Sequence, residues 1–285
     1  STHCISSAAS DVYKRQENVR GWLLTNNKEP QVYIVATPIG NKADFTLRAI
    51  DTLKNADIIA CEDTRTSAKL LESCGITTKL VSYHKFNEKQ RTTELLNFIE
   101  QGKKIALISD AGTPCISDPG RILVQELFKH KVKITSVPGA SALTTFTSMI
   151  PRDTEEFAFT GFLPRVKNQQ IKVFEKFVNT DLVFYESAQR LIETLENIKE
   201  SRTENAMIAV GRELTKMFEE IKTGTVQEVI DYYKTNTLKG EIVCMLYAGQ
   251  NADEEEYKII ENIKKLKSAA VSYTHLRAHE TRHDL

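Results

Sequence analysis

A short apolar run that stops abruptly in a glycine- and proline-rich loop constrains this sequence most. The run Ile105–Ile108 has the length and apolarity of a buried strand. The next segment, 109–120, holds two glycines, two prolines and two aspartates, Asp110 and Asp118, a composition typical of turns. Such residues let backbone groups approach a ligand closely, and an aspartate accepts hydrogen bonds from hydroxyl or amine groups. The segment is therefore either a plain strand-to-helix connection or one wall of a binding site.

The same pattern recurs twice, which favours the binding site. The apolar run 32–36 is followed by the loop 37–41, and the run 133–137 by the loop 138–142. Helix-like stretches separate the runs, at 44–55, 66–74, 87–100 and 119–130. Strands that alternate with helices predict βαβ units and a mostly parallel sheet, whose strand-to-helix loops gather at the carboxyl edge, where ligands bind. Neither of the common glycine-rich phosphate-binding motifs follows a strand, so the loops predict a site for a flexible small molecule.

The second half of the chain shows a different pattern. The break falls at 149–154, around Pro151, and a sequence of 285 residues is long enough for two lobes. After 156–162 come a helix-like 169–178, a strand-like 181–185, a helix-like 188–199 and the runs 206–210, 220–224 and 241–247. The strands are closer together and the crossovers fewer. We therefore predict an α/β protein with a mostly parallel sheet in lobe 31–150 and a mixed sheet in lobe 151–250.

Composition narrows the class of protein. No run approaches the roughly 18 apolar residues of a membrane span. The five cysteines and six histidines show neither disulfide nor metal-ligand spacing, so we expect no metal, no membrane partner and a cytoplasmic location. Lysine plus arginine equals aspartate plus glutamate at 38 each, which counts against a nucleic-acid partner because phosphate contacts normally need a basic face. Local clusters such as Arg165, Lys167 and Lys172 soften that objection.

The two ends do not fit the lobes. Residues 1–16 and 272–285 resemble translated adapter segments, and we exclude them from the fold. The segment 1–30 is thus an N-terminal extension, and 251–285 a truncated charged helix followed by an artefactual tail. We interpret the regular spacing of His275, His279 and His283 as part of that tail rather than as a metal site.

Six motifs in chain order carry a family resemblance. They are 35–41, Glu62–Arg65, 109–120, Pro138–Ala142, Phe184–Ser187 and Arg212–Lys216. Together they resemble the bacterial small-subunit rRNA (cytidine-2′-O-)-methyltransferases, members of the tetrapyrrole-methylase-like group of S-adenosylmethionine (SAM) enzymes. The resemblance covers about residues 31 to 250. It implies two α/β lobes with SAM folded in the cleft between them, a homodimer, and rRNA of the small ribosomal subunit as the partner.

The resemblance also implies site residues. Cofactor-binding residues are Thr37, Pro38, Gly40, Asp110, Ala111, Gly112, Thr113, Pro114, Ser141, Ala142, Tyr185 and Glu186. A ribose hydroxyl needs a base or a polarising network, and the catalytic candidates are Glu62, Asp63, Arg65, Glu186 and Lys216. Candidates for RNA binding are Arg65, Arg165, Lys167, Arg190 and Arg212. Simpler roles compete: Asp110 can stabilise a turn, Asp63 or Thr64 can cap a helix, and basic residues at helical spacing can form a solvated face.

Three hypotheses about function remain open at this stage. The first is SAM-dependent 2′-O-methylation of a cytidine in small-subunit (16S) rRNA. The second is methylation of a tetrapyrrole-like small molecule on the same fold, which suits the zero net charge better. The third is a non-catalytic SAM- or nucleotide-binding module. The motifs Glu62–Arg65 and Glu186-Ser187 favour the first hypothesis.

Overall fold

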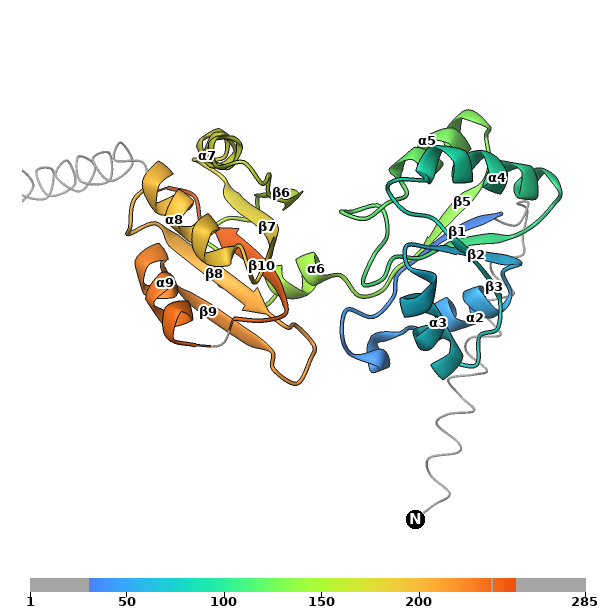
Figure 1. Cartoon of the computed structure of the whole chain (residues 1–285), viewed down its shortest axis with the longest axis horizontal. Helices are drawn as coiled ribbons and strands as arrows, with labels where there is room; N and C mark the ends of the chain where they lie inside the picture. Colours follow the sequence, from blue (N-terminus) through green and yellow to red (C-terminus); the bar gives the residue numbers. More distant parts are fainter. Residues whose placement is uncertain (1–30, 237, 250–285) are drawn as a thin grey trace, which may run out of the picture. The chain divides into compact units, whose positions relative to one another are not determined.

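The computed structural model describes residues 31–236 and 238–249. The chain divides between Ser141 and Ala142 into two compact units, and each unit has its own five-stranded sheet (Figure 1). The N-terminal extension and the C-terminal helix and tail expected from the sequence lie outside the described residues. Within the described part, no helix is both long and apolar enough to cross a membrane.

The first unit is built on a fully parallel sheet with the strand order β3-β2-β4-β1-β5. Its strands are β1 (Val32–Val35), β2 (Ile58–Cys61), β3 (Lys79–Ser82), β4 (Ile105–Leu107) and β5 (Ile134–Val137). Its helices are η1 (Lys42–Asp44), α2 (Leu47–Lys54), α3 (Thr64–Ser73), α4 (Glu88–Glu100) and α5 (Arg121–Lys129). Since every strand runs the same way, the loops after β1, β2, β3, β4 and β5 all leave from one edge of the sheet.

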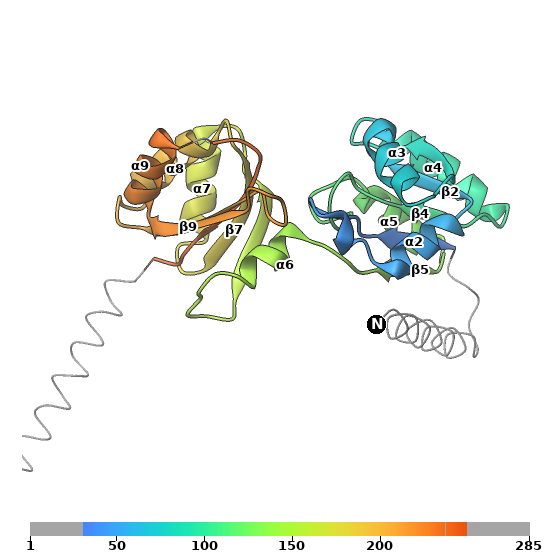
Figure 2. The same cartoon turned by 90° about the horizontal axis from the view of Figure 1, so that it is seen from below.

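Helices cover both faces of this sheet (Figure 2). Because side chains alternate along a strand, Ile59 of β2 faces the core formed with α2 and α3, where Leu53 and Leu71 are fully buried or nearly so. Its neighbour Ile58 faces the opposite core, which Leu95 of α4 and Leu123 of α5 fill. Burial on both faces explains why the strands read as continuous apolar runs in the sequence.

The second unit has a mixed sheet with the order β6-β7-β10-β8-β9. β6 and β7 are parallel, whereas the other neighbouring pairs are antiparallel. Its strands are β6 (Phe157–Phe162), β7 (Asp181–Ser187), β8 (Met207–Arg212), β9 (Glu220–Thr225) and β10 (Glu241–Leu246). Its helices are α6 (Ala142–Thr147), α7 (Lys167–Lys176), α8 (Leu191–Ser201) and α9 (Val226–Thr235).

Helices α7, α8 and α9 lie on one face of the mixed sheet (Figures 1 and 2). Phe174 of α7, Leu195 of α8 and Ile230 of α9 are all fully buried in the core beneath them. The short helix α6 contributes the buried ring of Phe146, which packs so tightly on β8 that a Cβ at Gly211 would lie 2.6 Å from it. This contact explains why α6 belongs to the second unit.

The predicted fold class is confirmed, with a parallel first sheet and a mixed second sheet. The sequence pattern did not predict β3, α6, α9 or the short helix η1. β3 is an edge strand with an exposed Lys79 and no fully buried residue, so it lacks the apolar signature of the inner strands. α9 begins directly at the end of β9, where Thr225 and Glu228 form a reciprocal capping box. The turn signals that usually separate a strand from a helix are missing there.

Candidate functional site

The loops after β1 and β4 are joined by main-chain hydrogen bonds at the carboxyl edge of the first sheet. Thr37 N donates to Gly112 O at 2.9 Å, and Gly112 N donates to Thr37 O at 3.0 Å. The hydroxyl of Thr37 also donates to Ser109 O at 3.1 Å, and Thr37 is buried. The two loops therefore form one small antiparallel bridge that extends beyond the parallel sheet.

The loop after β5 closes on the same bridge. Thr113 Oγ1 donates to Ala140 O at 3.1 Å. Gly112 has φ +81°, and a Cβ there would lie 3.2 Å from Ile39 Cγ2 and 3.6 Å from Ala140 O. A side chain at this position would press on both neighbouring loops. The three glycine- and proline-rich loops of the sequence are thus brought into direct contact.

Two acidic groups lie beside this three-loop junction. Asp110 Oδ1 accepts a hydrogen bond from Asp63 N at 3.2 Å, which links the β4 loop to the β2 loop. Desolvation raises the pKa of Asp110, and the charge of Asp63 adds to that effect. Desolvation likewise raises the pKa of Glu62, and the charges of Asp110 and Asp118 raise it further. Glu62 is thus a half-buried carboxyl group that binds a proton more readily than an ordinary glutamate.

The neighbours of Glu62 in its motif have different roles. Asp63 caps helix α3, because its Oδ1 accepts from Arg65 N at 2.8 Å. Arg65 follows on the first turn of α3 with an exposed side chain. The capping role considered for Asp63 is therefore present in the structure.

Glu186 lies in β7 of the second unit and is buried. Its Oε2 accepts from Thr194 Oγ1 at 2.8 Å, and its Oε1 accepts from Ser187 N at 2.8 Å. Arg190 lies 3.4 Å from the same carboxylate and donates to Pro164 O at 2.7 Å. These contacts join β7 to the start of α8 and to the segment after β6.

The motif Arg212–Lys216 forms a second set of ion pairs in this unit. Arg212 Nη2 lies 3.0 Å from Glu220 Oε2 across the β8–β9 pair. Lys216 Nζ lies 2.8 Å from Glu213 Oε1 and 3.0 Å from Glu241 Oε2. Burial lowers the pKa of Lys216, but hydrogen bonds to both glutamates outweigh it and raise the pKa overall. The ammonium group therefore stays charged and engaged within the unit.

The other predicted residues occupy a range of environments. Tyr185 packs edge-to-face against Phe159 and Phe162, with ring centroids 5.0 and 5.5 Å away. Arg165 is exposed, whereas Lys167 lies 2.5 Å from Glu200. The remaining cofactor candidates sit on the three joined loops or directly after them: Pro38 is buried, Gly40 is exposed, and Ala111, Pro114, Ser141 and Ala142 complete the set.

His84 is not among the site residues predicted from the sequence. His84 follows β3, the neighbour of the strand that precedes Glu62, and its charge lowers the pKa of Glu62. The sequence pattern did not predict strand β3. The loop after β3, which carries His84, was therefore not assigned to the carboxyl edge of the sheet, where the loops after the other parallel strands lie. Among the described residues, no group of three histidine, cysteine or acidic side chains could hold a metal ion.

The fold and the junction at the sheet edge define a class of protein. The family of tetrapyrrole (corrin/porphyrin) methylases matches residues 31–230. A solved structure of uroporphyrin-III C-methyltransferase from Thermus thermophilus, complexed with S-adenosylhomocysteine, superposes with a TM-score of 0.54. It covers 75% of this chain and 96% of its own, and at 16% identity it shows a shared fold.

Curated relatives narrow the class further. The ribosomal RNA small subunit methyltransferase I of Rickettsia prowazekii (strain Madrid E) is 48% identical over 217 residues, which is 75% of this chain and 77% of the relative. The protein of the same name from Mesorhizobium japonicum is 45% identical over 230 residues, which is 79% of this chain and 78% of the relative. The chain therefore belongs to the tetrapyrrole methylases and, within them, to the family of ribosomal RNA small subunit methyltransferase I.

Proposed function

We propose that this chain transfers a methyl group from SAM to the ribose 2′-hydroxyl of a cytidine in small-subunit rRNA. The observation that carries the proposal is 48% identity, over 75% of the chain, to a relative named ribosomal RNA small subunit methyltransferase I. The bound S-adenosylhomocysteine of the structural neighbour supports SAM as the methyl donor. The six motifs that carry the family resemblance favour the ribose as the acceptor.

The three-loop junction has the chemistry to hold SAM. The carboxylate of Asp110 can accept from a ribose hydroxyl or from an ammonium group. Within the described residues, Oδ1 is the one of its two oxygens that accepts a hydrogen bond, from Asp63 N. The exposed residues Pro138 and Gly139 on the neighbouring loop carry two backbone carbonyl groups and, at Gly139, an amide N–H. When bound, SAM supplies a methyl group on a sulfonium, which an oxygen nucleophile attacks in line. The protein then mainly positions the reacting groups.

We assign the general base to Glu62. A ribose hydroxyl attacks efficiently only as its proton leaves. Glu62 has a raised pKa and so a higher proton affinity than an exposed glutamate. By contrast, Asp63 is committed to the cap of α3, and Glu186 accepts from Thr194 and Ser187 while buried. Of the proposed carboxylates, Glu62 is therefore the one best able to take the proton.

For RNA phosphates we propose Arg65 and Arg165. Both are exposed and have no acidic partner among residues 31–236 and 238–249. Arg190, Arg212 and Lys167 are also candidates, but each forms an ion pair within its own unit. Their part in RNA binding would require those pairs to be shared or broken.

The decisive test uses the purified full chain, labelled SAM and small ribosomal subunits that lack ribose methylation. Digestion of the rRNA to nucleosides should yield labelled 2′-O-methylcytidine, and large subunits should give none. Asp110→Ala should weaken SAM binding, whereas Asp51→Ala, an exposed carboxylate on α2, should not. Glu62→Gln should keep SAM affinity and lose roughly 10²- to 10⁴-fold in rate. Unlabelled cytidine would overturn the proposal.

A small tetrapyrrole-like substrate is the second candidate, because the net charge of zero does not favour a polyanion. Label that appears on an added uroporphyrinogen rather than on rRNA would select it. We further propose a homodimer in the cytoplasm. Sedimentation of the full chain at the mass of two copies, in both the presence and absence of RNA, tests the dimer.

A further inference from the structure

The turn between β3 and α4 exposes an aromatic ring that the fold does not use. Phe86 is 95% exposed, the highest fraction among the large apolar side chains of the described residues. Among the described residues, its one aromatic neighbour is His84, edge-to-face with ring centroids 6.1 Å apart. A ring held in water contributes nothing to the stability of the unit. The ring is therefore available to contact a binding partner.

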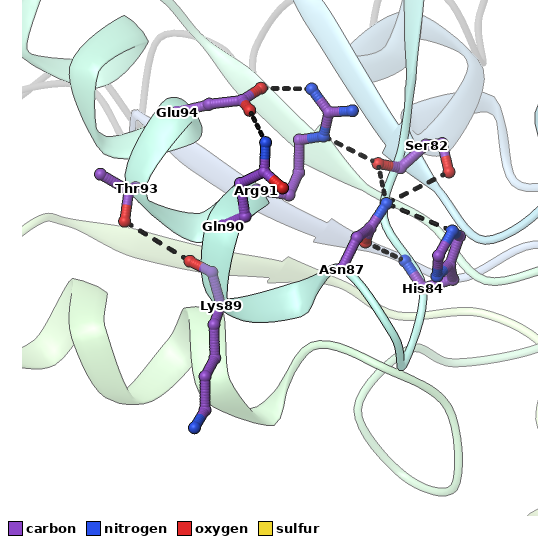
Figure 3. Close-up of polar contacts among 8 residues, drawn as sticks. All are labelled: Ser82, His84, Asn87, Lys89, Gln90, Arg91, Thr93 and Glu94. Atoms are coloured by element: carbon purple, nitrogen blue, oxygen red, sulfur yellow. Dashed lines mark hydrogen bonds and ion pairs between the residues drawn. The ribbon is translucent and has the colours of Figure 1, made fainter.

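The turn that carries Phe86 is held firmly rather than loosely (Figure 3). Asn87 Oδ1 accepts from His84 N at 2.8 Å, and Asn87 Nδ2 donates to Ser82 O at 3.2 Å. Arg91 Nε donates to the same carbonyl at 3.0 Å. Phe86 N itself donates to His84 Nδ1 at 3.3 Å. Because the loop is already ordered, little conformational entropy is lost when the ring meets a partner.

The groups around the ring are polar and positively charged. Lys85 precedes Phe86 and is exposed, and Lys89 follows on the first turn of α4. Neither lysine has an ion pair within residues 31–236 and 238–249. Figure 3 shows the Lys89 side chain extending away from the polar contacts of the turn. The ring of Phe86 thus lies between two lysines without ion pairs. Lysine is depleted in the core of protein–protein interfaces, so these surroundings do not favour a protein partner.

The turn lies beside the proposed base. Glu62 directly follows β2 and His84 follows β3, and the ends of these two strands pair through Cys61 and Ser82. The charge of His84 also lowers the pKa of Glu62. β3 and β2 are neighbours in the parallel sheet, so the loops after them leave from the same edge. Phe86 therefore lies on the loop next to the one that carries the proposed base.

We propose that Phe86 stacks on an unpaired nucleobase of the RNA next to the target cytidine, while Lys85 and Lys89 contact its phosphates. The inference rests on the proposed function, because it takes RNA as the substrate. Aromatic side chains stack on the faces of unpaired bases, and lysines neutralise the backbone alongside them. Phe86 is thus a positioning residue that helps to hold the acceptor strand at Glu62.

A direct readout of stacking comes from Phe86→Trp in the full chain. The probe is a single-stranded oligocytidylate of about ten nucleotides, a length within the range that single-stranded sites cover. Stacking should quench the fluorescence of the new indole, and raising the salt concentration should reverse the quenching. The matched control is Phe128→Trp. Phe128 is 74% exposed near the end of α5, at the opposite edge of the sheet, and its indole should not respond.

The enzymatic readout uses small ribosomal subunits as substrate. Phe86→Ala should raise KM for subunits by about 5- to 100-fold, equivalent to about 1–3 kcal/mol at 1.4 kcal/mol per tenfold. The affinity for SAM should not change. Phe86→Tyr should keep the wild-type KM, since it retains a ring, and Phe128→Ala should match the wild type. Because Phe86 is exposed, none of these substitutions should affect folding.

The outcomes separate the inference from the proposed function. If the wild type methylates subunits while Phe86→Ala has an unchanged KM and Phe86→Trp is not quenched, the stacking role is wrong and the function stands. If the wild type methylates no RNA but oligocytidylate still quenches Phe86→Trp, the function fails and stacking stands. Equal quenching by a DNA oligonucleotide supports stacking without selectivity for ribose. If Phe86→Ala dissociates a dimer instead, the ring is a protein contact and the inference falls.

Discussion

Gly120 offers the sharpest test of how the β4–α5 segment is held. It is the residue before α5 and has φ +135°, a conformation that side chains rarely adopt. A Cβ there would lie 2.4 Å from Cys115 Sγ and 2.7 Å from Leu107 Cδ2. Leu107 is the last residue of β4 and is buried. In Gly120→Ala, the methyl group must therefore displace the core or the loop.

The size of the effect follows from two separate costs. A backbone conformation that only glycine adopts easily costs about 1–3 kcal/mol for alanine. Overpacking against Leu107 and Cys115 costs about 1–3 kcal/mol more. The free energy of unfolding of the first unit should therefore fall by about 2–6 kcal/mol. Gly102→Ala is the matched control. Gly102 also has a positive φ, +78°, but nothing lies within 4 Å of its Cβ position, so that variant should lose only about 1–2 kcal/mol.

Urea unfolding followed by circular dichroism measures both variants against the wild type. Because the chain has two units, the unfolding curves are fitted with two transitions. The free energy of the transition that the variants shift is then compared with that of the wild type. SAM affinity gives a second readout, since a displaced segment 109–120 should also weaken the proposed cofactor site. Equal losses for Gly120→Ala and Gly102→Ala would refute the packing argument, because only the backbone cost would then remain.

Three further predictions concern the site and the second unit. Thr37→Val should destabilise the first unit by about 1–2 kcal/mol in urea, because the buried Ser109 carbonyl loses its 3.1 Å donor, whereas Thr37→Ser should keep that bond. A raised pKa means that ionising Glu62 costs stability once the pH passes the ordinary glutamate value of 4.5. Glu62→Gln should therefore raise the Tm at pH 7, and the gain should vanish as the pH falls below that value; an equal gain at pH 4 would contradict this cause. Glu186→Gln in β7 should cost about 1–3 kcal/mol because its partner Thr194 is buried, while Glu193→Gln, at an exposed position of α8, should be neutral.

Much of the fold could be predicted from local patterns. The strands β1, β2, β4 and β5 are apolar runs because the first sheet is covered on both faces. Their loops contain glycine and proline where the chain turns. β3 escaped because an edge strand needs fewer buried side chains, and Lys79 is exposed. The contact of Phe146 with Gly211, which attaches α6 to the second sheet, joins residues far apart in the chain and leaves no local signal.

The candidate site shows the same division between sequence and structure. The motifs Glu62–Arg65 and 109–120 indicated the chemistry of the site, because carboxylate groups and flexible loops can be recognised from residue type alone. Which carboxylate is suited to take a proton depends on its surroundings. Glu62 has its pKa raised by desolvation and nearby acids, Asp63 is used by a helix cap, and Glu186 is buried among donors.

By itself, the sequence determined the strand–loop–helix order, the family and the residues able to do the chemistry, because these follow from local periodicity and residue type. The tertiary structure decided which of those residues meet. It joined the loops of Thr37 and Gly112, engaged Arg190 and Arg212 in ion pairs, and brought the loop of His84 to the same sheet edge as Glu62. Burial, charge and contact between distant segments arise only when the folded chain brings those segments together, as the parallel sheet does for the loops at its carboxyl edge.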